Sequence, residues 1–295
     1  MTVVKKTQIE LRETMHAVTT TVVACCQLTP VFGDLAGNRE RTARAITDAA
    51  DAGASVVVLP ELVSSGYVFE SREEARACAE PADGETVTGW AGLAARHQAV
   101  IVGGFAESAG GELFNSAALV DPGGPRAVYR KAHLWDRERF WFTPGSDAPP
   151  VVATPFGRIS VMICYDLEFP EWVRLPALDG AQLLCAPVNW PEYGYPRPAG
   201  ERAAEVTRVQ ANAGVNRMFV AACDRDGTER GVDWVAGSVI ADPDGYPLAG
   251  PAQPTGSSTI ISAACELDDA LNKKVSPLND MHADRRPELY GRVAH

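Results

Sequence analysis

The stretch Ile159-Ser-Val-Met-Ile-Cys-Tyr-Asp166 joins an apolar run directly to a cysteine, and Phe169-Pro-Glu-Trp172 follows closely. The apolar run is typical of a buried strand, and Pro170 is typical of the first turn of a helix. A strand, a tight turn and a helix in this order place Cys164 at the carboxyl edge of a sheet, where ligands collect in layered α/β proteins. This stretch alone leaves two interpretations open, a nucleophilic thiol and a buried core cysteine.

The segments on both sides of this stretch alternate between strand and helix patterns. Apolar, β-rich runs predict strands over 22–28, 55–60, 99–106, 115–120, 127–130, 182–186, 218–223, 234–240, 246–248 and 257–266. Amphipathic segments predict helices over 38–51, 86–97, 171–180 and 199–213. Because the alternation continues without a linker or a short repeat, the sequence predicts one domain with two sheets between layers of helices.

Composition and charge exclude several classes of protein. The 295 residues carry a formal net charge of −11 without a basic stripe, which disfavours nucleic-acid and anionic-membrane partners. No run approaches ~18 consecutive apolar residues, so no membrane span is predicted. Seven cysteines without a Cys-x-x-Cys or Cys/His array argue against a disulfide framework and a zinc site, and favour a reducing cytoplasm. Residues 1–18 are polar and are predicted to form a leader outside the fold.

Three further ionisable residues lie at or just beyond the ends of predicted strands. Glu61 directly follows the strand at 55–60, where desolvation would raise its pKa and make it a general base; the alternative is a capping or loop glutamate. Lys131 closes the strand at 127–130, and its alternative is a surface lysine. Glu138 lies in the polar run after Lys131, and its alternative is a solvated charge.

A thiol, a carboxylate and an amine at three strand ends supply a nucleophile, a proton acceptor and a cation for a developing oxyanion. The blocks that carry them resemble the carbon–nitrogen hydrolase (nitrilase) superfamily. These blocks are Val57-Val-Leu-Pro-Glu61, Tyr129-Arg-Lys-Ala-His-Leu134, and Met162-Ile-Cys-Tyr-Asp166 with Phe169-Pro-Glu171. The resemblance runs in order from about Thr20 to Tyr290.

The resemblance implies a four-layer αββα sandwich of two mixed β-sheets over residues 19–272, with a triad of Glu61 as base, Lys131, and Cys164 as nucleophile. It further implies that Glu138 is a second glutamate that positions the substrate and the lysine. It places the backbone N–H of Tyr165 in the oxyanion hole, and Asn189 and Trp190 at the acyl pocket. The tail 273–295 resembles family tails that cross onto a partner subunit, which implies a homodimer or a larger homo-oligomer.

The residue types predict amide hydrolysis through a cysteine thioester, with no metal and no organic cofactor. Cys164-Tyr-Asp resembles the amidase branches of the superfamily rather than the Cys-Trp-Glu of nitrilases. Leu167 and Glu168 stand where carbamoylases usually carry arginines, so a short, neutral aliphatic amide is the predicted substrate. A nitrilase, an N-carbamoyl amide hydrolase, an acyltransferase of the same superfamily and a non-catalytic binding protein remain as alternatives.

Several other residues receive predictions of their own. His133 is predicted to be structural, Gly103-Gly104 to allow a close backbone approach, and Cys78 to lie exposed in a polar helix. Four aromatic residues are predicted to wall a small apolar acyl pocket, namely Trp135, Trp141, Trp190 and Tyr193.

Overall fold

The computed structural model describes residues 20–192, 197–198 and 200–294, and its central feature is a pair of six-stranded mixed sheets packed face to face. The first sheet has the order β14-β1-β2-β3-β4-β5. Its strands are β1 (Thr21–Gln27), β2 (Val56–Val58), β3 (Val100–Ala109), β4 (Glu112–Asp121), β5 (Gly124–Arg130) and β14 (Thr259–Cys265). The three strands β1, β2 and β3 are parallel, and the remaining pairings are antiparallel.

The second sheet has the order β13-β12-β9-β8-β7-β6 and the same mixed character. Its strands are β6 (Val151–Thr154), β7 (Gly157–Val161), β8 (Leu183–Pro187), β9 (Phe219–Cys223), β12 (Val239–Ala241) and β13 (Pro247–Ala249). The parallel strands β7, β8 and β9 lie side by side, so their carboxyl ends share one edge of the sheet. The other pairs of this sheet are antiparallel.

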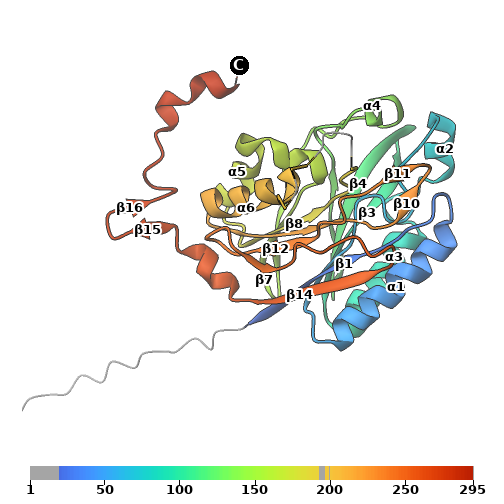
Figure 1. Ribbon diagram of the computed structural model, residues 1–295, viewed down its shortest axis with the longest axis horizontal. Coiled ribbons are helices and arrows are strands. Elements are labelled where there is room, and N and C mark those ends of the chain that lie inside the picture. Colours follow the sequence, from blue (N-terminus) through green and yellow to red (C-terminus); the bar gives the residue numbers. More distant parts are fainter. Residues whose placement is uncertain (1–19, 193–196, 199, 295) are drawn as a thin grey trace, which may run out of the picture.

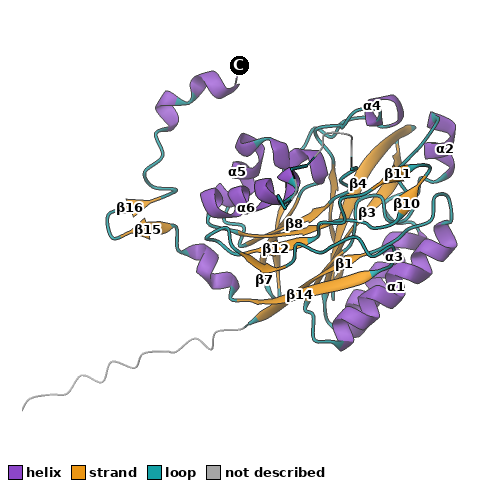
Figure 2. Ribbon diagram, viewed as in Figure 1, coloured by secondary structure: helices purple, strands orange, loops and turns teal. Residues whose placement is uncertain are grey.

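Helices cover the outer face of each sheet. The pair α1 (Leu35–Asp51) and α3 (Glu85–His97) packs on the first sheet, and α5 (Pro170–Leu178) and α6 (Ala204–Asn216) pack on the second (Figure 1). The sheets therefore form the two inner layers and the helices the two outer ones (Figure 2). The predicted αββα sandwich is confirmed, and so is the predicted helix start at Pro170, which occupies the first turn of α5.

The interior between the sheets is apolar and fully buried. Strands β1, β2 and β3 of the first sheet contact β8 and β9 of the second, and Val residues such as Val58 and Val102 lie in the same cluster as Leu184 and Val220. This close packing brings the strand ends of one sheet against those of the other. Residues that follow β2, β5 and β7 therefore meet at one end of the molecule.

The remaining elements are short. Beside the sandwich lie α2 (Arg72–Ala77), α4 (Glu138–Trp141), a 3-10 helix at Cys164–Glu168, and the hairpin of β10 (Thr228–Glu229) and β11 (Val232–Asp233). The C-terminal part carries 3-10 helices at Leu267–Leu271, Pro287–Leu289 and Gly291–Ala294, with β15 (Lys274–Ser276) and β16 (Asn279–Asp280) between them. Figure 1 shows this part extending away from the sandwich.

Two predicted elements differ from the structure. The helix predicted over 199–213 begins only at Ala204, because Gly200 has a left-handed backbone (φ +82°) that a helix cannot contain. The strand predicted over 234–240 is reduced to β12, because Ala236 has a positive φ of 52° and breaks the extended run. The predicted leader at 1–18 lies outside the described residues.

Candidate active site

Three strand ends position the predicted triad. Glu61 follows β2 after Leu59 and Pro60, and Lys131 directly follows β5 in the same sheet. Cys164 follows β7 in the opposite sheet and begins the 3-10 helix. All three residues are buried, with Glu61 and Lys131 exposing 1% or less of their surface.

Lys131 is held between two carboxylates. Its Nζ lies 2.7 Å from Glu61 Oε1 and 2.7 Å from Glu138 Oε1, and all three side chains are buried. Burial alone would lower the pKa of Lys131, but the negative charges of Glu138 and Glu61 outweigh it and raise that pKa above its usual value. The two carboxylates therefore favour the charged ammonium of Lys131, and they engage two of its three N–H groups.

Glu61 has one occupied and one open carboxylate oxygen. Its Oε1 also accepts a hydrogen bond from Asn115 Nδ2 at 2.7 Å, whereas its Oε2 is buried and has no partner among the residues that the structure describes. Burial raises the pKa of Glu61 to about 7, although the charge of Lys131 opposes this. A carboxylate with an open oxygen and a pKa near neutrality has the properties of a general base.

A close backbone approach holds Glu61 in place. A Cβ atom on Gly104 would lie 2.6 Å from Glu61 Cα and 2.4 Å from Leu62 N, so only glycine fits there. The prediction that Gly104 allows a close approach is confirmed. From the other sheet, Asn189 Nδ2 donates to the Glu61 carbonyl at 2.9 Å.

Cys164 has an unusual backbone and a thiol whose pKa is raised. Its φ is +46°, a left-handed conformation that non-glycine residues adopt rarely and that clusters at functional sites. Its Sγ lies 3.6 Å from the carbonyl oxygen of Asn189. Burial raises the pKa of Cys164 well above its usual value; the charge of Glu61 raises it further, and that of Lys131 lowers it. These charges act on the thiol because the three groups lie in one buried cluster.

Glu138 belongs to the same cluster, as the sequence predicted, and Tyr67 is a residue that the sequence analysis missed. The Tyr67 hydroxyl donates to Glu138 Oε1 at 2.6 Å, and the Trp135 backbone N–H donates to Glu138 Oε2 at 3.1 Å. Glu229 in turn accepts from the Tyr67 backbone N–H at 2.8 Å. No motif or strand end surrounds Tyr67 in the sequence, so its contact with Glu138 could not be predicted.

A cavity of about 470 Å³ opens over Cys164. The residues that were predicted to bind substrate all line it, namely Tyr165, Asn189 and Trp190. Trp135 lines it too, and its ring meets that of Tyr165 edge to face at 5.3 Å between centroids. The placement of Trp141 in this wall was wrong: Trp141 lines a separate cavity of about 150 Å³ and packs against the cluster around Phe69. Tyr193 lies outside the described residues.

The lining of this cavity also carries a charged pair. Arg208 Nε lies 2.8 Å from Glu168 Oε2, and Glu205 is a second carboxylate 3.5 Å from Arg208. Burial raises the pKa of Glu168, and Arg208 opposes that shift. Because Arg208 pairs with Glu168, the repulsion of anionic substrates that the sequence predicts for Glu168 is partly offset.

A buried aspartate that the sequence analysis missed supports Trp190. Asp224 follows β9 and is fully buried, and its carboxylate accepts from the backbone N–H groups of Trp190 at 3.0 Å, Arg225 at 2.9 Å and Gly237 at 3.0 Å. Burial raises its pKa to about 7. The signal was present in the sequence, because Asp224 is one more polar residue at the end of an apolar strand.

Two other predictions concern residues near the site. His133 is structural, as predicted: its ring stacks on Phe169 at 3.8 Å between centroids and its Nδ1 lies 2.7 Å from Asp166 Oδ1. The prediction that Cys78 is exposed was wrong, since it caps the end of α2, is 6% exposed and packs in an apolar cluster.

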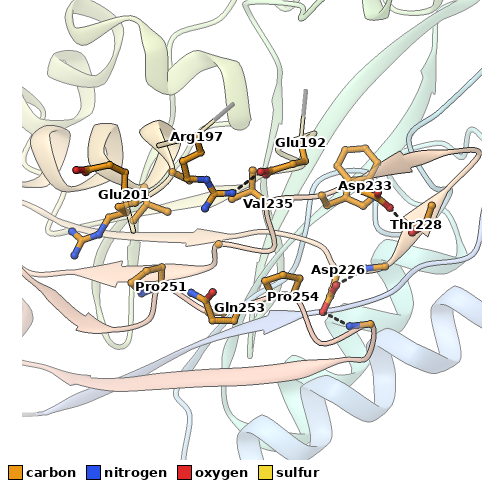
Figure 3. A pocket seen from close by; sticks show the side chains of 18 of the residues that line it. Glu192, Arg197, Glu201, Asp226, Thr228, Asp233, Val235, Pro251, Gln253 and Pro254 are labelled. Carbon is orange, nitrogen blue, oxygen red and sulfur yellow. Dashed lines mark hydrogen bonds and ion pairs between the residues drawn. The ribbon is translucent and has the colours of Figure 1, made fainter. Parts of the chain in front are cut away.

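A second cavity of about 860 Å³ lies beside the first and shares Glu192, Arg197 and Val235 with it (Figure 3). Several of its polar side chains have partners. Asp226 accepts hydrogen bonds from the backbone N–H groups of Thr255 and Gly256, and Arg197 pairs with Glu192 at 2.6 Å.

In the part of the chain that the structure describes, no group of three or more His, Cys, Asp or Glu residues is arranged to hold a metal ion. No helix among the described residues is long and apolar enough to cross a membrane.

Comparisons with known proteins point to one family. A family model described as carbon-nitrogen hydrolase matches residues 22–272. A protein named nitrilase from Pyrococcus abyssi is 36% identical over 271 residues, which cover 92% of this chain and 99% of the relative. An (R)-stereoselective amidase from a Pseudomonas species is 34% identical over 224 residues, which cover 75% of this chain and 77% of the relative.

Solved structures agree with these relatives. An amidase from a Nesterenkonia species superimposes with a TM-score of 0.74 at 26% identity, over 92% of this chain and 96% of the other. A mutant of that amidase carries the acetamide moiety of fluoroacetamide covalently on its active-site cysteine, and superimposes with a TM-score of 0.73 at 27% identity over 92% and 95% of the two chains.

Proposed function

The chain belongs to the carbon-nitrogen hydrolase family and is a hydrolase of non-peptide carbon–nitrogen bonds, and we propose that it converts small aliphatic amides to a carboxylic acid and ammonia through a thioester on Cys164. One observation carries this proposal. A buried thiol lines a cavity and shares one buried cluster with an ammonium that lies 2.7 Å from a carboxylate, and the second oxygen of that carboxylate has no partner among the described residues.

The first half of the proposed reaction forms the thioester. Glu61 Oε2 takes the thiol proton while Cys164 Sγ bonds to the amide carbon and the carbonyl electron pair moves to oxygen. The remaining N–H of Lys131 and the backbone N–H of Tyr165 stabilise this oxyanion, and each such donor contributes roughly 3–4 kcal/mol. The intermediate then collapses, the carbon–nitrogen bond breaks, and Glu61 gives its proton to the departing ammonia.

The second half reuses the same groups. Glu61 takes a proton from water, the hydroxide attacks the thioester carbon, and the sulfur leaves with the proton that Glu61 returns. Glu138 keeps Lys131 in place through its contact of 2.7 Å, and Tyr67 holds Glu138. The proposed chemistry uses no metal and no organic cofactor.

Aromatic rings near Cys164 support an apolar acyl group. Trp135, Tyr165 and Trp190 line the cavity with Cys164, and the charges of Glu168 and Arg208 in the same lining are paired with each other. A panel of propionamide, butyramide, propionitrile and an N-carbamoyl amino acid, assayed for ammonia, tests this assignment. Amides should release ammonia fastest. Faster ammonia release from the nitrile would indicate a nitrilase, and faster release from the carbamoyl compound would indicate an N-carbamoyl amide hydrolase. If hydroxylamine is added and hydroxamate forms faster than the amide is hydrolysed, the protein is an acyltransferase.

The activity should rise with pH through an acid limb near 7. Glu61 must be ionised to accept the thiol proton, and burial raises its pKa to about 7, so kcat/KM falls as pH drops below that value. Asn115 donates to Glu61 and stabilises its ionised form, so Asn115→Ala should move the limb to higher pH. Measuring kcat/KM against pH for both proteins checks this. Asn216→Ala, which removes a buried amide remote from Glu61, is the control. If the acid limb of Asn115→Ala lies at the same pH as that of the wild type, a group other than Glu61 controls this limb.

We further propose that residues 19–272 form the catalytic domain and that the tail 273–295 docks on a second copy in a homodimer. Leu278 is 91% exposed and Leu289 is 63% exposed on the extended C-terminal part (Figure 1). Large apolar side chains at such exposure indicate an interaction surface. The double change Leu278→Asp and Leu289→Asp should give monomers in light scattering, whereas Tyr246→Asp, at another exposed site (69%), should leave the dimer intact. If the double variant is still a dimer, the tail is not part of the dimer interface.

The cytoplasm is the proposed location. All seven cysteines belong to the described residues and all are free thiols, which fits a reducing compartment.

A further inference from the structure

The carboxylate of Asp166 joins the two sheets at the active site. Asp166 lies two residues after Cys164 and is completely buried. Its Oδ2 accepts from the Tyr129 hydroxyl at 2.7 Å and from the Ile163 backbone N–H at 3.2 Å. Its Oδ1 lies 3.0 Å from the His133 backbone N and 2.7 Å from His133 Nδ1. Each oxygen thus has two partners.

These partners flank the two reacting residues. Ile163 directly precedes Cys164, and Tyr129 and His133 stand two residues before and two residues after Lys131. Lys131 follows β5 of the first sheet, whereas Cys164 follows β7 of the second, so no ladder of strand hydrogen bonds links them. The distance between nucleophile and ammonium therefore depends on side-chain contacts across the layer.

The network continues outward and is rigid. The Tyr129 hydroxyl accepts from Trp172 Nε1 at 3.0 Å, which ties it to α5. The His133 ring stacks on Phe169 at 3.8 Å between centroids. The same carboxylate holds the Ile163 N–H next to the left-handed backbone of Cys164, a conformation that persists only when its surroundings fix it.

We infer that Asp166 is a positioning residue for the reaction, which sets the place of Cys164 relative to Lys131 without touching substrate. This inference rests on the proposed function. A misplacement of reacting groups by about 1 Å can cost up to roughly 10²-fold in rate. A loss of Asp166 should therefore lower kcat strongly, and should affect KM little because the cavity walls stay.

The test compares amide hydrolysis with a reaction of Cys164 that needs no oxyanion site. Asp166→Asn places an amide N–H₂ against hydrogen-bond donors, and Tyr129→Phe removes only one of the four contacts. We expect kcat for propionamide to fall roughly 10- to 100-fold in Asp166→Asn and less in Tyr129→Phe, with KM within about threefold. The modification of Cys164 by methyl methanethiosulfonate, followed by peptide mass spectrometry, should slow by less than about threefold, because it needs no oxyanion donor and depends on Lys131 only through the fraction of thiolate.

The matched control is Asp226→Asn. Asp226 is also a buried aspartate with four donors, at the second cavity, and its change should lower Tm without lowering kcat (Figure 3). If hydrolysis and thiol modification fall together, or if Asp226→Asn loses as much kcat as Asp166→Asn, Asp166 is only structural and the inference fails. If Asp166→Asn does not fold, an unchanged kcat in Tyr129→Phe overturns it. Wild-type protein whose thiol reacts but which hydrolyses no amide would refute the proposed function instead.

Discussion

Replacing Cys164 by alanine lowers kcat/KM for amides by roughly 10⁴-fold or more, as expected for the loss of a nucleophile that acts with its base as one unit. The fold should survive, because among the described residues the thiol makes one weak hydrogen bond, to the Asn189 carbonyl at 3.6 Å. The measurement is ammonia release at saturating and at low amide concentration, together with Tm. Cys164→Ser should recover little, because a hydroxyl is a weaker nucleophile than a thiol.

The control for this change is another buried thiol. Cys185 in β8 is completely buried in the core between the sheets and away from the cavity over Cys164. Cys185→Ala should cost about 1 kcal/mol of stability through lost packing and should leave kcat unchanged. Substantial activity in Cys164→Ala would exclude Cys164 as the nucleophile.

Replacing Lys131 by methionine has the second largest expected effect, and it acts on both rate and stability. The variant loses an oxyanion donor, which costs about 10²- to 10³-fold in kcat. It also leaves two buried carboxylates without their cation, since Glu61 and Glu138 both lie 2.7 Å from Nζ. Breaking a buried ion pair in this way destabilises a protein by about 3–5 kcal/mol.

This destabilisation should depend on pH in a defined direction. Burial already raises the pKa of Glu61 in the folded protein, and without Lys131 nothing of comparable strength opposes it. A carboxyl group whose folded pKa is raised contributes stability below its unfolded pKa and loses that contribution as pH rises through the folded value. Lys131→Met should therefore be less destabilised near pH 5 than near pH 8 in urea unfolding.

The neighbouring residue supplies the control. Arg130 pairs with Glu107 at 2.6 Å, and its side chain is 37% exposed whereas Glu107 is buried. Arg130→Met leaves one buried carboxylate without its cation rather than two, so it should cost less stability than Lys131→Met and should keep activity. The account of a cation shared by two buried acids would be contradicted if Arg130→Met lost as much stability and activity as Lys131→Met. It would also be contradicted if Lys131→Met were more stable at high pH than at low pH.

The parts of this site that the sequence predicted follow one rule. Glu61, Lys131 and Cys164 each come at or just after the end of an apolar strand, and such ends meet where two sheets pack together. The alternation of strands and helices likewise predicted the layers, because periodicity records which face of an element is buried. The predicted length of the strand that the structure has at 239–241 was too great, because a positive φ at Ala236 cannot be recognised from the amino-acid composition.

The residues that support the triad were harder to predict. Tyr67 and Asn115 reach Glu138 and Glu61 through contacts between segments far apart in the chain. Tyr67 lies in no predicted element, and Asn115 begins a predicted strand instead of following the carboxyl end of one. Trp141 was misplaced because a short helix, α4, turns it toward a different cavity from that of Cys164. The pairing of Glu168 with Arg208 joins the 3-10 helix that begins at Cys164 to α6, and no local pattern in the sequence indicates such a contact.

The most direct test of the central claim is a search for the acyl group on Cys164 during turnover. Wild-type protein is mixed with excess propionamide, quenched in acid within the first turnovers, digested and analysed by mass spectrometry. The peptide that contains Cys164 should carry the mass of one propionyl group, which disappears once the amide is consumed. Ammonia released at the full rate while that peptide stays unmodified, or with the propionyl group on another residue, would contradict the mechanism.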